Sequence, residues 1–369
     1  MAESSRLLRG NMQVAAYLGG EMKPRLVRST FLSICLLGSV TAIAQQATRD
    51  FDAEYESEIR EAKAAAGFEH LGVLNRLCVL PPTLGARTHN DVPGYVLDPS
   101  TAPPREIWYA EAAQIFDELY WLGGAIHSAW LLATSEGHIL IDTQFPYNSG
   151  ELILGGMEKL GLDPSDIRYI VISQAHNDHI GGVELVQEVS GAPVVMGEAD
   201  WDLVATYPNR YRSMTPDRAN GIEVSESMTL TLGETSVDIY PTPGHTEGTL
   251  SYIFTVHDFG RPVVVAYSGG TAFNFQTDTP DPGIPNLERF IESQRSFAGI
   301  AAEAGATVLL SNHSEFDDAH DKTRMLAGRG FGANPFVSSA EWVQRYFDVM
   351  IHCARAKVVG LEQRSAGIR

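Results

Sequence analysis

The chain has 369 residues, of which 27 are basic and 46 are acidic, so it carries a formal net charge of −19 at pH 7. Its content of 44% hydrophobic and 20% charged residues is typical of a globular protein, with length for one large domain or two smaller ones. An acidic surface repels phosphate backbones, which makes nucleic acid a poor partner and argues against a nuclease.

Residues 22–45 have the pattern of an export signal. The basic stretch MKPRLVRS precedes the apolar stretch TFLSICLLGSV, and Ala42 and Ala44 mark a small-residue cleavage site. We therefore expect translation to start at Met22, residues 1–44 to be removed, and the protein to be periplasmic or secreted. The alternative is a short buried or anchoring helix. Removal would leave 22 basic against 44 acidic residues, a net charge of −22, and no stretch that spans a membrane.

Two cysteines, Cys78 and Cys353, remain after such a cleavage. Export exposes them to an oxidising environment, so a disulfide between the N-terminal segment and the last helix is one expectation. Two buried free thiols are the alternative. They are too few and too far apart in the sequence for a metal cluster.

The N-terminal part, residues 45–117, contains one predicted helix over 51–66. Asp50 or Asp52 can cap its start and Gly67 its end. Residues 79–105 are rich in proline, glycine and threonine, and we expect them to be extended and irregular.

The pattern changes at residue 118, where short apolar runs rich in β-forming residues begin. About a dozen such runs alternate with helical patterns up to residue 357, which predicts two β-rich halves with helices outside. Of the late helices, one covers 287–304. The other covers 338–357 and opens with a capping box from Ser338 to Glu341. Residues 358–369 are expected to be a C-terminal tail.

The stretch VISQAHNDHIGG contains the most informative residues of the chain. His176, Asp178 and His179 follow the apolar strand pattern IRYIVIS and precede a helical pattern, so they lie on a strand-to-helix turn. Imidazole and carboxylate groups that converge from such a turn suit zinc. The alternative is a helix start capped by Asn177 or Asp178, with the histidines merely nearby.

Two further histidines strengthen the metal interpretation. His245 follows a strand and a Pro-Gly turn in YPTPGHTEG, and His313 follows the strand pattern ATVLLS. Both lie at strand ends, where loops build functional sites.

These motifs resemble the metallo-β-lactamase superfamily over roughly residues 118–350. The resemblance includes LID before the site, the H-x-D-H turn, PGHTxG and the late strand-end histidine. Within the superfamily the chain is most similar to subclass B3, to which SAWLLATSEGHILIDT and the exported layout point. The resemblance implies an αβ/βα four-layer sandwich, with two β-sheets flanked by helices, and a site for one or two zinc ions.

Carried over by position, the resemblance implies two sets of metal ligands. The first set is Gln174, His176 and His245, and the second set is Asp178, His179 and His313. Glutamine stands where the family has a histidine, as in some B3-like enzymes, and an amide oxygen binds zinc more weakly than imidazole does. The alternative is that Gln174 points away and binds nothing.

Other positions are assigned with less support from the pattern. Asp142, at the end of HILID, matches an aspartate that supports the metal turn by hydrogen bonding. Glu315 is a weaker candidate for the same role. Ser268 and Thr271 stand where other branches, such as thioesterases and lactonases, have a bridging aspartate or where other lactamases have a cysteine, and the alternative for both is a plain glycine turn. Five of the other histidines are interpreted as surface or core residues because they match no motif: His127, His138, His257, His320 and His352.

The resemblance implies hydrolysis of a small molecule, with the amide bond of a β-lactam opened by the hydroxide that zinc generates from water. Asp178, His176 and His179 are the expected catalytic residues. One alternative is a hydrolase of the same fold that acts on another ester, amide or lactone. The other is a zinc-stabilised binding protein without catalysis.

Overall fold

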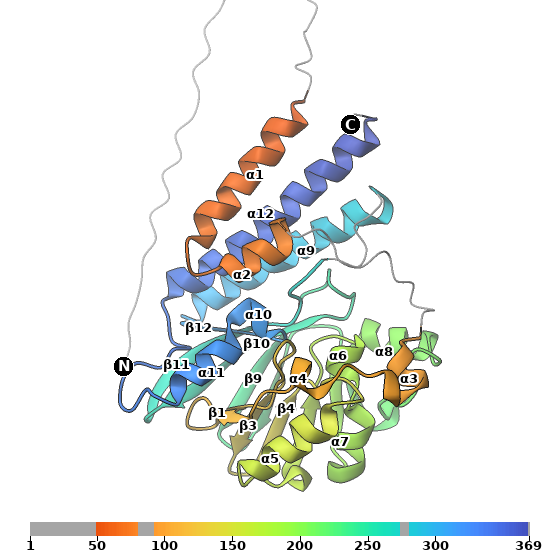
Figure 1. Ribbon diagram of the computed structural model, residues 1–369, viewed down its shortest axis with the longest axis vertical. Helices are drawn as coiled ribbons and strands as arrows, with labels where there is room; N and C mark the ends of the chain where they lie inside the picture. The colour runs from red at the N-terminus through yellow and green to blue at the C-terminus, as the bar shows by residue number, and fades with distance from the viewer. Residues whose placement is uncertain (1–48, 80–91, 274–279, 368–369) are drawn as a thin grey trace, which may run out of the picture. The chain divides into compact units, whose positions relative to one another are not determined.

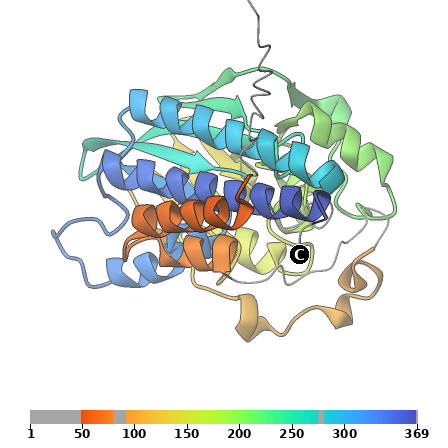
Figure 2. The same ribbon diagram turned by 90° about the horizontal axis from the view of Figure 1, so that it is seen from above.

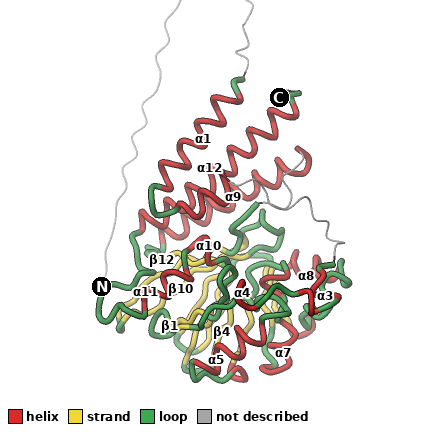
Figure 3. The backbone as a smooth tube through the Cα atoms, in the orientation of Figure 1, coloured by secondary structure: helices red, strands yellow, loops and turns green. Residues whose placement is uncertain are grey.

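The structure of the protein is a computed structural model that describes residues 49–79, 92–273 and 280–367 (Figure 1). The predicted export signal at residues 1–44 lies outside the described residues. In the described part, twelve strands form two mixed β-sheets with helices on their outer faces, as the tube view shows in yellow and red (Figure 3).

The first sheet has seven strands in chain order. β1 to β4 are antiparallel neighbours, and β4 to β7 are parallel ones. Their bounds are β1 Ala113–Gln114, β2 Leu119–Trp121, β3 Trp130–Thr134, β4 Gly137–Ile141, β5 Ile167–Val171, β6 Val194–Gly197 and β7 Gly221–Val224.

The second sheet has five strands in the order β12-β11-β10-β9-β8. All its neighbours are antiparallel except β11 and β12, which are parallel. Their bounds are β8 Met228–Leu232, β9 Thr235–Pro241, β10 Leu250–Asp258, β11 Arg261–Ser268 and β12 Val308–Ser311.

The helices connect and cover these strands. Those before the first sheet are α1 Phe51–Ala66, α2 Leu71–Leu74, η1 Asn75–Val79, α3 Gly94–Leu97, η2 Pro99–Thr101 and α4 Arg105–Trp108. Those within it are η3 Gly150–Leu154, α5 Gly155–Lys159, η4 Pro164–Asp166, α6 Asn177–Ile180, α7 Val183–Ser190, α8 Glu198–Thr206 and η5 Arg218–Asn220. The late ones are α9 Pro280–Glu303, α10 Ser314–Asp317, α11 Ala319–Leu326 and α12 Ala340–Ser365.

Strand β10 shows why the two sheets stack with helices outside. Side chains alternate between the faces of a strand, yet the first five residues of β10 are all buried. Tyr252 and Phe254 join the core between the sheets, whereas Ile253 joins the core beneath the outer helices. A third apolar cluster packs α5, α7 and α8 on the other sheet. The predicted four-layer sandwich is therefore confirmed.

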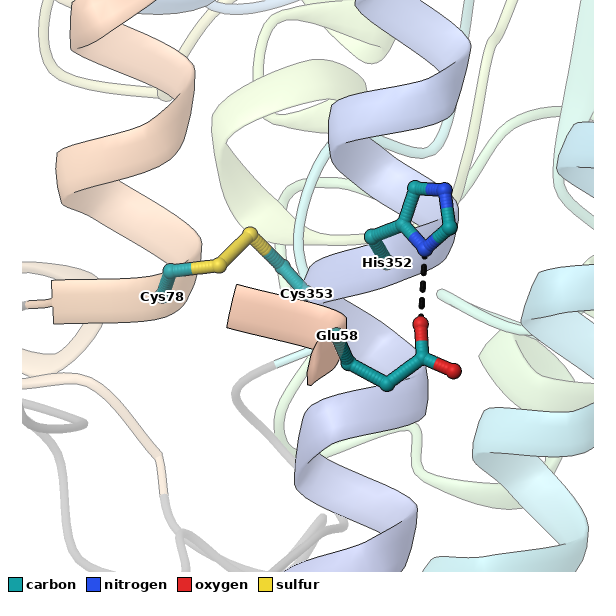
Figure 4. Close-up of a disulfide and its surroundings, with 4 residues drawn as sticks. All are labelled: Glu58, Cys78, His352 and Cys353. Carbon is teal, nitrogen blue, oxygen red and sulfur yellow. Dashed lines mark hydrogen bonds and ion pairs between the residues drawn. A yellow bond between two sulfur atoms is a disulfide. The ribbon is translucent and has the colours of Figure 1, made fainter. Parts of the chain in front are cut away.

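Helices α1, α12 and α9 lie side by side over the second sheet, as the view from above shows in orange, violet and cyan (Figure 2). The covalent link predicted for this region is present: Cys78 of η1 is bonded to Cys353 of α12 (Figure 4). Beside it, Glu58 of α1 pairs with His352 of α12 at 2.6 Å. The expectation of a disulfide is confirmed, and the N-terminal segment is tied to the last helix.

Three local expectations are wrong. Of residues 79–105, which were expected to be extended and irregular, residues 80–91 lie outside the described residues, and the part from residue 92 on forms the short helical pieces α3, η2 and α4. Ser339, not Ser338, caps the last helix by accepting a hydrogen bond from the Trp342 backbone N–H. That helix continues to Ser365, where a tail from residue 358 was expected, because Val359 and Leu361 are buried in the structure.

Candidate metal centre

The turn after β5 carries three of the predicted site residues. His176 immediately precedes helix α6 and makes no side-chain capping bond to it, while Asp178 and His179 lie within α6. The cap-only alternative is therefore not supported. A Cβ atom on Gly182 would lie 1.7 Å from the Ser149 Oγ, so only glycine lets this turn pack on the segment that follows β4.

Asp142 holds His179 in a defined orientation. Its Oδ2 lies 2.9 Å from His179 Nδ1, and it also accepts hydrogen bonds from the Ser173 hydroxyl at 2.7 Å and the Tyr267 hydroxyl at 3.2 Å. Because Nδ1 of His179 donates to this buried carboxylate, its Nε2 is turned toward Asp178. The predicted supporting contact of Asp142 is present in the structure.

Asp178 lies at the centre of a group of imidazoles. Its Oδ2 is 3.0 Å from His179 Nε2, 3.3 Å from His313 Nε2 and 3.4 Å from His127 Nε2. Burial would raise the pKa of Asp178, but the charge of His179 and the hydrogen bonds from His179 and His313 hold this pKa well below its usual range. Asp178 is therefore a carboxylate at neutral pH.

The electrostatics of this group favour a bound cation. Burial would lower the pKa of His179, but Asp178 and Asp142 raise it to about 10 in the metal-free protein. A protonated His179 imidazole thus stabilises the carboxylates of Asp178 and Asp142 when no metal is bound. Burial lowers the pKa of His127 to about 3, so that imidazole is neutral and offers a lone pair. A divalent metal can replace the proton because it meets the same carboxylate and imidazole donors.

The second pair of predicted ligands lies together in the structure. His176 Nδ1 is 3.0 Å from His245 Nε2, and His245 Nδ1 bonds the carbonyl oxygen of Ala272. Burial first, and the neighbouring histidines next, lower the pKa of His245 to about 4. These two imidazoles are the part of the first ligand set that the structure brings together.

Gln174 does not complete this pair. Its Oε1 accepts the backbone N–H of His176 at 2.8 Å, and its buried Nε2 has no hydrogen-bond partner within the described residues. An amide nitrogen is a donor and does not ligate a metal. The orientation of Gln174 therefore disfavours it as a ligand, and the assignment of all six ligands stays a prediction.

Asp200 of α8 is a supporting residue that the sequence reasoning missed. It accepts hydrogen bonds from Ala175 N, Gly248 N and the Thr246 hydroxyl at 2.7, 3.1 and 2.9 Å. It thereby joins the turn that carries His176 to the loop that carries His245. Burial raises the pKa of Asp200 to about 6, although these donors favour its charged form. The sequence signal for this role was the position of an acidic residue at the start of a helix that follows a strand.

Other sequence candidates lie outside the group. Ser268 and Thr271 are buried, and the Thr271 hydroxyl donates to Asn312 Oδ1, so the glycine-turn alternative fits both. Glu315 pairs with Arg76 at 3.6 Å and not with His313. Among these five histidines, His127 is the exception, because it faces Asp178. Its place directly before the stretch SAWLLATSEGHILIDT was the available signal.

The donor set fits a zinc ion. Zinc with four ligands at 2.0–2.2 Å sets neighbouring ligand atoms about 3.3 Å apart in a tetrahedron. The separations of 3.0 and 3.3 Å from Asp178 Oδ2 to His179 and His313, and of 3.2 Å between the two imidazole Nε2 atoms, agree with such edges. The contact between Asp142 and His179 also supplies the orienting carboxylate that metal-bound histidines usually have.

Comparisons with known proteins agree with this geometry. A sequence profile described as the Metallo-beta-lactamase superfamily matches residues 122–259, which include the whole turn after β5 and His245. The protein carries a metallo-beta-lactamase superfamily domain. Members of this superfamily are hydrolases, and the chain has the metallo-β-lactamase fold.

Two solved structures share the fold of this domain. BJP-1, a subclass B3 metallo-beta-lactamase of Bradyrhizobium japonicum, is 25% identical with a TM-score of 0.54, covering 70% of this chain and 95% of its own. Native FEZ-1 metallo-beta-lactamase from Legionella gormanii is 21% identical with a TM-score of 0.58, covering 69% and 97%.

A curated relative has a different activity in its name. An N-acyl homoserine lactonase of Bacillus sp. is 24% identical over 180 residues, which are 42% of this chain and 68% of the relative. Both a cyclic amide and a lactone are therefore substrates of proteins similar to this one, and the domain alone does not choose between them.

Proposed function

We propose that the protein is an exported zinc-dependent hydrolase that opens the amide ring of β-lactams. The observation that carries the proposal is the carboxylate of Asp178, surrounded by imidazole nitrogens and backed by the contact of Asp142 with His179. The structural similarity to subclass B3 metallo-beta-lactamases supports the choice of substrate. The absence of an acidic residue at Ser268–Thr271 also supports it.

The chain's own residues have separable roles in this proposal. Asp178, His179 and His313 would hold zinc, which when bound lowers the pKa of water to about 7 and polarises a carbonyl group. The Asp178 side chain is 17% exposed, so its carboxylate can orient an attacking water. Asp142 keeps His179 in the tautomer that the site needs.

Aromatic side chains lie beside the metal residues. Phe145 packs edge-on against His127 at 4.8 Å and stacks on Tyr147 at 4.9 Å. Tyr95 of α3 packs against both Phe145 and Tyr147. These half-buried rings suit the apolar part of a lactam or lactone substrate.

The test is hydrolysis of a chromogenic cephalosporin by the purified protein, with zinc content recorded. We expect turnover that a chelator removes and zinc restores. Asp178→Ala should lower kcat/KM at least about 100-fold, because losing one preorganised electrostatic group commonly costs 10²–10³-fold. Near-wild-type turnover by this variant would contradict the mechanism.

A lactone is the second candidate substrate, favoured by the similarity to the N-acyl homoserine lactonase. Acid release from a panel of lactones and esters would be measured under the same conditions. A larger kcat/KM on a lactone than on any β-lactam would replace the first proposal. A zinc-loaded protein that turns over neither class would favour a binding protein without catalysis.

A further inference from the structure

His127 is held beside His313 by its own backbone. Ser128 N donates to Asn312 O at 2.9 Å and Ser314 N donates to Ile126 O at 2.8 Å, so the two histidines oppose each other in a short antiparallel bridge. The carbonyl oxygen of His127 accepts a further bond from Gln144 Nε2 at 2.9 Å. The position of this histidine is therefore fixed by the fold.

Its imidazole points into the group around Asp178. The Nε2 atom lies 3.4 Å from Asp178 Oδ2, and the donor atoms of His127, Asp178 and His313 all lie within 4.8 Å of one another. The ring also packs against Phe145, which limits its rotation. A donor that is fixed in place and directed at a ligand carboxylate is positioned to bind the same metal.

We infer that His127 is a fourth protein ligand of the metal held by Asp178, His179 and His313. This inference rests on the metal of the proposed function. It makes that centre a site of three imidazoles and one carboxylate. The chain, which lacks an imidazole at position 174, thus has an additional one at position 127.

A consequence for chemistry follows from the ligand number. Catalytic zinc sites usually have three protein ligands and leave the fourth position to water. With His127 bound, water enters only as a fifth ligand or by displacing one imidazole. The inference therefore predicts tight zinc binding at this centre.

The test compares zinc affinity and ligand number in two variants. His127→Ala removes the proposed ligand, and His257→Ala is the control, because His257 is exposed and pairs with Glu118. Zinc dissociation constants would be measured by competition with a chelating indicator. We expect the constant to rise at least about tenfold in His127→Ala and to stay unchanged in His257→Ala.

X-ray absorption of the protein loaded with one equivalent of zinc counts imidazoles directly. The count should be three in the wild type and in His245→Ala, which disables the other histidine pair, and two in His127→Ala. Two imidazoles in the wild type, or unchanged affinity in His127→Ala, would overturn the inference. The wild-type count decides even if His127→Ala does not fold.

The outcomes separate this inference from the proposed function. Zinc binding that depends on His127, without turnover of lactams or lactones, upholds the ligand and rejects the activity. Turnover of a lactam or lactone by a protein with two imidazoles at the metal upholds the activity and rejects His127 as a ligand. A wild-type protein that binds no zinc overturns both.

Discussion

The side-chain amide oxygen of Gln174 accepts a hydrogen bond from a backbone N–H, and its amide nitrogen is buried. That oxygen satisfies His176 N, so the glutamine supports the turn in the way a capping side chain does. Burial of the unpartnered Nε2 is unfavourable by about 1–3 kcal/mol. The His176–His245 pair consequently lacks a third ligand from this position.

Gln174→His should supply the missing imidazole. We expect the zinc content of the purified protein to rise from about one toward two per chain, since three histidines bind zinc well. Metal content would be measured by mass spectrometry after dialysis against a weak chelator. Gln174→Ala is the matched control and should leave the content at the wild-type value. An unchanged content in the histidine variant would mean that position 174 does not reach a metal.

Single residues were predictable to different degrees. The H-x-D-H turn and the strand-end histidines predicted which side chains converge, because sequence spacing and strand ends fix where they lie. His127 was not predictable in the same way, since its place depends on an antiparallel bridge to His313, nearly two hundred residues away in the chain. The use of the Gln174 oxygen by the backbone likewise depends on the local fold.

Helix α8 is hydrogen-bonded to the two segments that carry His176 and His245. Asp200 accepts three hydrogen bonds from the segments that carry His176 and His245. A Cβ atom at Gly248 would lie 2.5 Å from Asp200 N, so glycine is required for this close approach. The PGHTxG motif therefore has a packing reason for its final glycine besides its histidine.

Asp200→Ala should loosen both loops. It leaves two buried backbone N–H groups, those of Ala175 and Gly248, without this acceptor at about 1–3 kcal/mol each, so we expect the free energy of unfolding to fall by about 2–6 kcal/mol. Urea unfolding monitored by circular dichroism measures this loss. Asp202→Ala is the control on the same helix, because its exposed ion pair with Arg218 contributes at most about 1 kcal/mol. Equal stability of the two variants would contradict the bracing role.

At the level of helices and strands, the apolar strand patterns were informative because both sheets bury most of their residues. The helical pieces of residues 92–108 were not predicted, since their proline and glycine content is equally typical of irregular loops. The sequence pattern predicts that the last helix ends at Lys357, because its exposed face is polar there. The helix continues beyond this residue, and Val359 and Leu361 are buried.

The N-terminal helices are joined to the far end of the chain by the Cys78–Cys353 disulfide. They also contact the segment that follows His313. Arg76 pairs with Glu315, two residues after His313, and Gly72 lies so close to the Glu315 carbonyl that a Cβ atom would come within 2.9 Å. The described residues include no helix with the length and apolarity to cross a membrane.

Removing the disulfide should destabilise the whole molecule. A cross-link between residues 275 positions apart restricts the unfolded chain, and its loss should lower the free energy of unfolding by about 3–5 kcal/mol. Urea unfolding of the double variant Cys78→Ser/Cys353→Ser, against the oxidised wild type, measures the effect. Mass measurement without reductant checks the bond itself, and two alkylatable thiols in the purified protein would contradict it.

The closed loop has a consequence for proteolysis. All predicted metal ligands, from Gln174 to His313, lie between the two bridged cysteines. A protease that cuts once between the first and the last of these ligands would thus leave two pieces still covalently joined, each carrying part of the ligand set. Under oxidising conditions such a nicked protein would gain only the mass of one water molecule, whereas a reductant would release the pieces.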